Sequence, residues 1–300
     1  MNQETLRGLL DLARDAAWAG AAVLERHARH VTGRRVDFAN KGGSPIDLVT
    51  EVDHESERAI VAVLRRAGIP IVAEESGAEE SGAEESGAED ARSDADASLT
   101  PGAPGDAVFY VDPLDGTTNY AHGHPFHSVS IGLVLEGEPV LGVVHAPMLG
   151  ALWTGARDLG GSRRDLFRGI EQPLAVSTVD SLDASLGATG FPYDRRTSAD
   201  DNLAAFGALT KSTHGVLRCG SAALDLALVA DGTYDLYWER KLKPWDLAAG
   251  AALVAVAGGR VSDPWGARFS SASGAIAASN GRVHDALLSA IARHQPEAPR

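Results

Sequence analysis

The chain has 300 residues, of which 44% are hydrophobic, and a formal net charge of −14. This length suits one large domain or two ordinary ones, and the apolar share is enough to build a buried core. The charge is concentrated, because residues 74–96 hold seven Glu and three Asp against one Arg. This acidic balance argues against a nucleic-acid partner, which requires a basic face.

The N-terminal thirty residues predict an amphipathic helix rather than a signal peptide. Its apolar face consists of Leu6, Leu9, Leu10, Ala13, Ala17 and Val23. No apolar run in the sequence reaches the roughly 20 residues needed to cross a bilayer. Cys219 is the single cysteine, which rules out an intramolecular disulfide and fits a reducing compartment. We therefore expect a cytoplasmic protein with no membrane partner.

A second helix is predicted after Asp53, with Ile60, Val61 and Leu64 facing inward and Gly68 as its stop. A buried strand is predicted next, over residues 69–73. Residues 74–106 are poor in large apolar side chains and repeat the unit AEESG three times near their start. Such a segment cannot bury enough surface to offset its ordering entropy, so we expect a mobile acidic loop.

Strand signals resume at residues 107–111 and continue as a hairpin of residues 128–135 and 140–146, followed by residues 151–154. From about residue 170 short strands alternate with helices, which favours an α/β arrangement. The predicted strands are 174–177, 186–189 and 233–237, and the predicted helices are 201–210, 222–230 and 247–257. We expect an N-terminal α+β domain over residues 1–168 and a C-terminal α/β domain over residues 169–300.

The densest chemical signal is the stretch VDPLDGTTNY, residues 111–120. Asp112 and Asp115 follow a strand, and Pro113 stiffens the turn between them because its φ angle is fixed. The next residues could open a helix whose free backbone N–H groups bind an anion. Carboxylates beside an anion site make sense when a hard cation such as Mg²⁺ bridges them.

Taken alone, each of these acids has an ordinary explanation. An Asp-Pro turn needs no ligand, and Asp53 and Asp246 each stand at a helix start, where an Asp is most often the N-cap. Glu74 and Glu75 lie at the exit of a strand, where sites of α/β proteins tend to lie. It is the set of acids that favours a metal site.

Three ordered motifs, AEES, VDPLDGTTNY and PWDLAAGAALVAVAGG, resemble those of the inositol monophosphatase family. The resemblance runs from KGGSPIDLVTEVD to AIAASN. It implies a layered αβαβα sandwich, a homodimer, lithium sensitivity and Mg²⁺-dependent hydrolysis of a phosphate monoester, with inositol monophosphate or a similar phosphorylated polyol as substrate. Related substrates remain open: fructose 1,6-bisphosphate, NADP, histidinol phosphate and 3′-phosphoadenosine nucleotides. A non-catalytic metal-binding homologue is a further alternative.

The same resemblance implies roles for individual residues. Two or three Mg²⁺ ions would be held by Glu74, Asp112, the carbonyl of Leu114, Asp115 and Asp246. Asp53 and Thr117 would orient and deprotonate the attacking water, with Glu74 contributing through a third, weaker ion. Gly116 and Thr117 would bind phosphate through their N–H groups, and Lys41 would lie near the weaker metal site. The alcohol would contact Asp115, Gly220, Ser221, Ala222, Glu239 and Asp246.

The repeat leaves one ligand ambiguous. Glu74 follows the predicted strand directly, whereas Glu79 and Glu84 lie five and ten residues further along in identical local sequence. A metal ligand must be rigidly placed, which favours Glu74. A slip of the strand would let Glu79 or Glu84 take its place.

Overall fold

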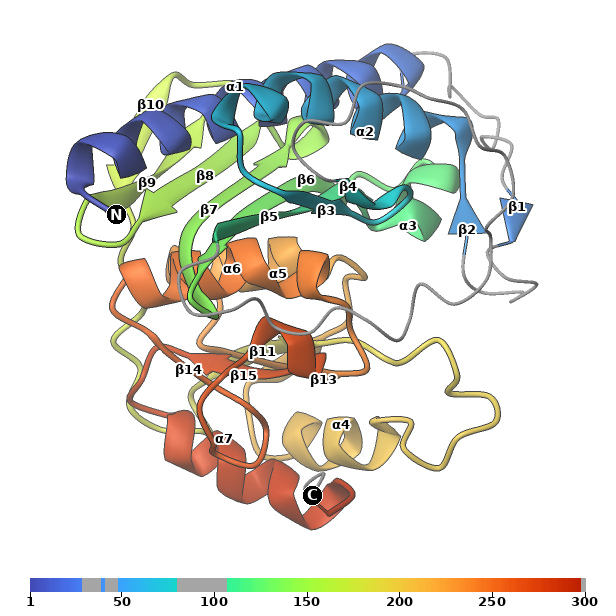
Figure 1. Ribbon diagram of the computed structural model, residues 1–300. Helices are drawn as coiled ribbons and strands as arrows, with labels where there is room; N and C mark the ends of the chain where they lie inside the picture. The colour runs from blue at the N-terminus through green and yellow to red at the C-terminus, as the bar shows by residue number, and fades with distance from the viewer. Residues whose placement is uncertain (29–38, 41–47, 80–106, 298–300) are drawn as a thin grey trace.

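The computed structural model describes residues 1–28, 39–40, 48–79 and 107–297, which are stacked in alternating layers of helix and sheet (Figure 1). The outer helices α1 and α2 cover one face of the first sheet, α5 and α6 fill the space between the two sheets, and α4 and α7 cover the far face of the second sheet. The helices are α1 (Gln3–Ala28), α2 (Glu51–Leu64), α3 (Thr117–Ala121), α4 (Leu203–Thr210), α5 (Ala222–Ala230), α6 (Pro244–Val256) and α7 (His284–Ile291). The expected αβαβα sandwich is confirmed.

The first sheet has eight strands in the order β10-β9-β8-β7-β6-β5-β3-β4. Its neighbours are antiparallel except for β3 and β5, which run parallel. The strands are β3 (Ile71–Ala73), β4 (Gly77–Glu79), β5 (Ala107–Asp115), β6 (Ser128–Leu135), β7 (Glu138–Ala146), β8 (Ala151–Ala156), β9 (Gly160–Asp165) and β10 (Ile170–Pro173). The parallel pair matters for the site, because the ends of β3 and β5 reach the same edge of the sheet.

The second sheet has five strands in the order β12-β11-β13-β15-β14. Strand β11 is parallel to β12 and β13, whereas β15 is antiparallel to β13 and β14. The strands are β11 (Leu186–Thr189), β12 (Gly215–Leu217), β13 (Leu236–Arg240), β14 (Arg260–Ser262) and β15 (Ala275–Ser279). A separate ladder pairs β1 (Ala39–Asn40) with β2 (Leu48–Val49).

The sequence-based predictions of local structure mostly hold. Helix α5 has the predicted bounds, the predicted β6–β7 hairpin is present, and Gly68 ends the turn after α2 with a left-handed φ of 64°. The strand predicted over residues 174–177 is wrong, because this segment bonds to scattered partners as it passes from one sheet to the other: Leu174 N–H donates to Gly161 O and Val176 N–H to Ala257 O.

Two further expectations need correction. Strand β13 begins at Leu236 rather than at residue 233, and residues 77–79 form β4 instead of a loop. In β4 the backbone pairs with β3, so that Glu79 lies opposite Ile71. The rest of the expected mobile segment, residues 80–106, lies outside the described residues.

Close packing of α6 against the first sheet fixes the position of the helix. A Cβ atom on Gly142 of β7 would lie 2.2 Å from Ala249 O, so the helix backbone rests directly on the strand. Ala248 and Ala249 add little bulk at this contact, which brings helix and sheet together. The N-terminal end of α6, with Asp246, is thereby held near the edge where β5 ends.

The boundary expected between residues 168 and 169 falls between β9 and β10, which pair within the first sheet. The division into two domains stays a prediction. Among the described residues, no helix combines the length and apolar character that crossing a membrane requires.

Candidate active site

Glu74 and Asp112 are brought together by the parallel pairing of β3 and β5. Ala73 is opposite Val111 in this ladder, and the backbone N–H of Glu74 donates to Val111 O at 3.1 Å. Each acid is therefore the next residue along its strand. The side chain of Glu74 lies close enough to Asp112 for its negative charge to raise the pKa of Asp112, after the larger effect of burial.

Pro113 interrupts β5 between the two acids of the motif. The register with β6 shifts between Asp112 and Asp115, as expected where a proline supplies no ladder N–H. Leu114 N–H turns back to donate to Asp112 Oδ1 at 2.9 Å, and Ser56 Oγ donates to Pro113 O at 2.9 Å. This irregular turn is buried, so both carboxylates have fixed positions at the end of the strand.

Asp115 accepts three hydrogen bonds from the start of α5. Ser221 Oγ and Ala223 N donate to Oδ2 at 2.7 Å each, and Ala222 N donates to Oδ1 at 3.3 Å. Burial raises the pKa of Asp115 to about 6 even though these bonds favour its ionised form. The contacts connect the first sheet to the helix layer, and they place Ser221 and Ala222 beside Asp115, as the family resemblance implies.

Asp246 and Asp53 occupy the third position of their helices rather than the N-cap. Helix α6 begins at Pro244 after the N-cap Lys243, whose N–H donates to Asp246 Oδ2 at 2.7 Å. Helix α2 begins at Glu51 after the N-cap Thr50, whose N–H donates to Asp53 Oδ2 at 2.8 Å. The N-cap interpretation was therefore wrong by three residues, because each acid closes a capping box from inside the first turn.

Three carboxylates from β5 and α6 converge on one point. Ligand oxygens of Asp112, Asp115 and Asp246 all lie within 4.8 Å of one another. The pKa of Asp246 is raised by loss of solvation and then by Asp115 and Glu74. Like charges held this close destabilise one another unless protons or a cation compensate them.

The donor set fits Mg²⁺ on chemical grounds. All the groups are oxygen donors, which hard divalent cations prefer, and the Leu114 carbonyl adds another near the carboxylates. Of the predicted ligands, the carboxylates of Asp112, Asp115 and Asp246 form one group within 4.8 Å, and Glu74 lies outside this group but close enough for its charge to raise the pKa of Asp112. The roles of all these residues as ligands stay predictions.

Asp53 and Thr117 form a hydrogen-bonded pair next to these acids. Thr117 Oγ1 lies 3.0 Å from Asp53 Oδ1 and 3.1 Å from Leu114 O, either of which can accept its single proton. Burial is the main cause that raises the pKa of Asp53, and the Thr50 hydrogen bonds oppose it. Asp53 is fully buried, so Thr117 is the member of the pair nearer to solvent.

Gly116 precedes α3 and takes a left-handed φ of 97°, which turns the chain from β5 into the helix. Asn119, one turn later, was missed by the sequence analysis. Its Nδ2 donates to Phe126 O at 2.6 Å and to Cys219 O at 2.7 Å, which joins the loop before α5 to α3. Asn119 lies in the same motif, VDPLDGTTNY, as Asp112 and Asp115, and this was the signal that could have identified it. Through this contact Gly220 is held next to Gly116.

Glu239 lies on β13 at the second sheet, among residues that the sequence did not connect with it. Burial raises its pKa to about 7, and the hydroxyl of Tyr237 donates to its Oε2. Asp225 on α5 is also fully buried, and burial followed by the charges of Glu239 and Asp115 raises the pKa of Asp225 well above its usual range. Tyr237 and Asp225 lie in the stretch GSAALDLALVADGTYDLYWE, residues 220–239, which also carries Glu239, but the sequence analysis assigned neither of them a role.

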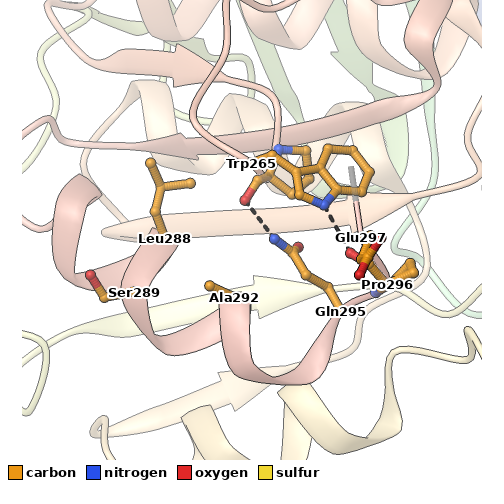
Figure 2. Close-up of a pocket in the computed structure, with 8 residues that line it drawn as sticks. Trp265, Leu288, Ser289, Ala292, Gln295, Pro296 and Glu297 are labelled. Atoms are coloured by element: carbon orange, nitrogen blue, oxygen red, sulfur yellow. Dashed lines mark hydrogen bonds between the residues drawn. The ribbon is translucent and has the colours of Figure 1, made fainter. Parts of the chain in front are cut away.

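Lys41 and Glu84 lie outside the described residues, so the structure says nothing about their expected or alternative roles. A separate surface pocket of about 440 Å³ lies beside α7, lined by Trp265, Leu288 and Gln295 among others (Figure 2). Gln295 Nε2 donates to Pro264 O at 2.9 Å, and Trp265 Nε1 to Pro296 O at 3.0 Å. Glu297 is the single acidic residue in its lining, so this pocket does not offer a group of carboxylates like that of Asp112, Asp115 and Asp246.

Comparison with known proteins agrees with this geometry. The model of the inositol monophosphatase family matches residues 5–297. The chain belongs to the inositol monophosphatase family. An inositol-1-monophosphatase of Synechocystis sp. is 38% identical over 289 residues, covering 96% of this chain and 90% of the relative.

Other family members give the same result. The Nus factor SuhB of Escherichia coli is 34% identical over 282 residues, which are 93% of this chain and 94% of the relative. The solved structure of the inositol monophosphatase from Anabaena (Nostoc) sp. PCC 7120 has a TM-score of 0.78 and 38% identity and covers 97% of both chains. The fold and the family are therefore established over nearly the whole chain.

Proposed function

We propose that this member of the inositol monophosphatase family is a Mg²⁺-dependent phosphate monoester hydrolase that releases inositol and phosphate from inositol monophosphate. The observation that carries the proposal is the convergence of Asp112, Asp115 and Asp246 beside the hydrogen-bonded pair Asp53–Thr117. The identity to a relative named inositol-1-monophosphatase supports this choice of substrate.

Glu74, Asp112, the Leu114 carbonyl, Asp115 and Asp246 would hold two or three Mg²⁺ ions. Bound there, the ions would neutralise phosphoryl oxygens, lower the pKa of water and stabilise the leaving oxygen. The protein's contribution is to fix the carboxylates before the ions arrive, through the Pro113 turn and the three bonds to Asp115.

Thr117 and Asp53 would move the proton of the attacking water. While Thr117 Oγ1 donates to Asp53 Oδ1, its lone pairs are available to accept from a water. A proton taken by Thr117 is matched by one passed on to Asp53, whose raised pKa makes it a better acceptor than an ordinary Asp. Glu74, at the end of β3, would contribute to this step through the third, weaker ion.

The remaining residues would bind the substrate. Backbone N–H groups of Gly116 and Thr117 would bind the phosphate. The alcohol would lie against the Asp115 and Asp246 carboxylates, the Gly220–Ala222 segment and Glu239, because carboxylates accept hydrogen bonds from hydroxyl groups. Ser221 and Ala222 already donate to Asp115, so they would also hold that carboxylate in orientation.

One assay tests this function: phosphate release from inositol 1-phosphate, fructose 1,6-bisphosphate, NADP, histidinol phosphate and a 3′-phosphoadenosine nucleotide, each with Mg²⁺ and with chelator. We expect Mg²⁺-dependent turnover, fastest with inositol 1-phosphate. If another ester is hydrolysed faster, that ester replaces inositol 1-phosphate as the proposed substrate. If none of the esters is hydrolysed, the result favours a non-catalytic metal-binding homologue.

We further propose a homodimer, inhibition by lithium and a cytoplasmic location. The first two rest on family membership, and the third is supported by the single cysteine. Sedimentation, a lithium titration of the assay and cell fractionation test them separately.

A further inference from the structure

Gly190, the residue after β11, lies directly against the carboxylate of Glu239. A Cβ atom built on Gly190 would be 2.1 Å from Oε1 and 2.2 Å from Oε2 of Glu239, distances at which no side chain fits. The φ angle of Gly190 is outside the left-handed region, so its backbone would accept any residue. The glycine is therefore required by the position of the carboxylate and not by the turn.

Asn202 holds Gly190 in this place. This buried residue has a left-handed φ of 64°, unusual for a side chain with a Cβ, and directs its amide into the interior. Its Nδ2 donates to Gly190 O and to Thr189 Oγ1 at 2.8 Å each, and its Oδ1 accepts from Trp238 Nε1 at 2.9 Å. Asn202 thus joins the end of β11 to the residue that precedes Glu239.

The segment between these two residues, which we call the 190–202 loop, is also fixed to the residues that follow Glu239. Asp200 pairs with the buried Arg240, and Lys241 Nζ donates to Asp194 Oδ2 at 2.7 Å and to Ser198 Oγ at 2.9 Å. The loop therefore makes hydrogen bonds to the residues before and after Glu239, namely Trp238, Arg240 and Lys241.

The carboxylate of Glu239 is consequently held from two directions. Gly190 limits it on one side, and the Tyr237 hydroxyl donates to Oε2 on the other. A carboxylate fixed in this way can meet a hydroxyl group of defined orientation, which is what discriminates between polyols.

We propose that Gly190 and Asn202 are positioning residues that set the orientation of the Glu239 carboxylate, and thereby the preference of the enzyme for a phosphate ester whose alcohol carries ring hydroxyls. The proposal rests on the proposed function. It concerns only the alcohol side, so the phosphate side should be insensitive to both residues.

Gly190→Ala is the informative variant. A methyl group there collides with the Glu239 carboxylate, which has to leave its position against Gly190, and the melting temperature of the variant measures the cost of this movement to folding. We expect the KM for inositol 1-phosphate to rise about tenfold, as for one charge-assisted hydrogen bond, with kcat changed less than about twofold. Turnover of p-nitrophenyl phosphate, whose alcohol has no ring hydroxyls, should stay the same.

Gly207→Ala is the matched control, because the same substitution in α4 meets nothing within 4 Å. Tyr237→Phe loosens the same carboxylate by another route and should show the same substrate selectivity. In a Glu239→Gln background, Gly190→Ala should add no further rise in KM. Melting temperatures recorded for every variant separate a loss of positioning from a loss of folding.

Two results would overturn the positioning role: equal losses on both substrates, or a Gly190→Ala effect that persists in the Glu239→Gln background. A wild-type protein that hydrolyses p-nitrophenyl phosphate but not inositol 1-phosphate would instead refute the substrate of the proposed function, and this is read before any variant is made.

Discussion

The two sides of the site are built by opposite means. On the proposed metal side, Asp112, Asp115 and Asp246 lie close together, and burial with the negative charge of neighbouring acids raises the pKa of each. On the alcohol side, the acid Glu239 is limited by a glycine and receives a hydrogen bond from Tyr237. The first arrangement is stabilised when protons or a cation compensate its charges, whereas in the second a protein hydroxyl already donates to the carboxylate.

From this contrast we expect substitutions on the two sides to have different effects on activity. Under the proposed roles, loss of one acid on the metal side would remove a ligand, and the turn at Pro113 and the helix α6 would keep the other acids from taking its place. Loss of a contact on the proposed alcohol side would change only the orientation of the Glu239 carboxylate. The metal side should therefore decide whether reaction occurs, and the alcohol side should decide on which ester.

The strongest test of this contrast is Asp112→Asn. An amide is a weaker ligand for a hard cation, so we expect kcat/KM to fall by about 10³-fold, roughly 4 kcal/mol, with inositol 1-phosphate and p-nitrophenyl phosphate alike. Without metal the variant should melt higher than wild type at pH 7.5, since one buried charge is gone. A loss confined to inositol 1-phosphate would assign Asp112 to the alcohol side.

Acid should weaken the second sheet through His284. This histidine is buried between Ser262 Oγ at 2.9 Å and Ser279 Oγ at 3.0 Å, and burial lowers its pKa to about 4. An unfolded histidine titrates near 6.5, so the stabilising contribution is complete above that pH and is lost as pH falls towards 4. The loss in the free energy of unfolding reaches up to about 3 kcal/mol.

Urea unfolding of wild type and His284→Gln at pH 7 and pH 4.5 measures this loss. The variant should lose less stability between the two pH values, and the exposed His294→Gln should behave like wild type. An identical acid sensitivity in all three proteins would show that His284 is protonated in the folded state.

Glu74→Gln compared with Glu84→Gln resolves the ambiguity of the repeat. Glu74 directly follows β3 and Glu79 is drawn into β4 opposite Ile71, so we expect about a 100-fold loss of kcat/KM for Glu74→Gln. Glu84→Gln should stay within about twofold of wild type. Equal activities of the two variants would refute the choice of Glu74.

Added Mg²⁺ should stabilise the metal side. At 100 times its dissociation constant, a ligand of the folded state contributes about 2.7 kcal/mol, which raises the melting temperature by several degrees. Asp246→Asn should reduce the shift and Gly190→Ala should leave it intact. An equal melting temperature of the wild-type protein with and without saturating Mg²⁺ would contradict the cation site.

Asn202→Ala is expected to have the smallest effect on reaction chemistry. It leaves Gly190 O and Trp238 Nε1 without their partner, at a cost of about 2 kcal/mol in the free energy of unfolding. The KM for inositol 1-phosphate should rise while turnover of p-nitrophenyl phosphate persists. Chemical denaturation and the two assays check this, and a parallel loss on both esters would place Asn202 outside the alcohol side.

Much of the metal side could be predicted from the sequence, because its information is local. Pro113 between two acids predicts a stiff turn, and the apolar runs before Glu74 and Asp112 predict the strands that carry them. The alcohol side could be predicted only through resemblance, since Glu239 lies in an ordinary strand and Gly190 in an ordinary loop.

The family, the alternation of helices and strands, and the acids at the ends of these elements follow from the sequence alone. The approach of Asp246 to Asp112 and the contact of Glu239 with Gly190 are seen only in the folded chain. Such contacts depend on how closely backbones approach, as where α6 lies on Gly142, and on pairings between segments far apart in the chain. Periodicity reports which face of an element is buried, but it carries no information about which distant residue that face will meet.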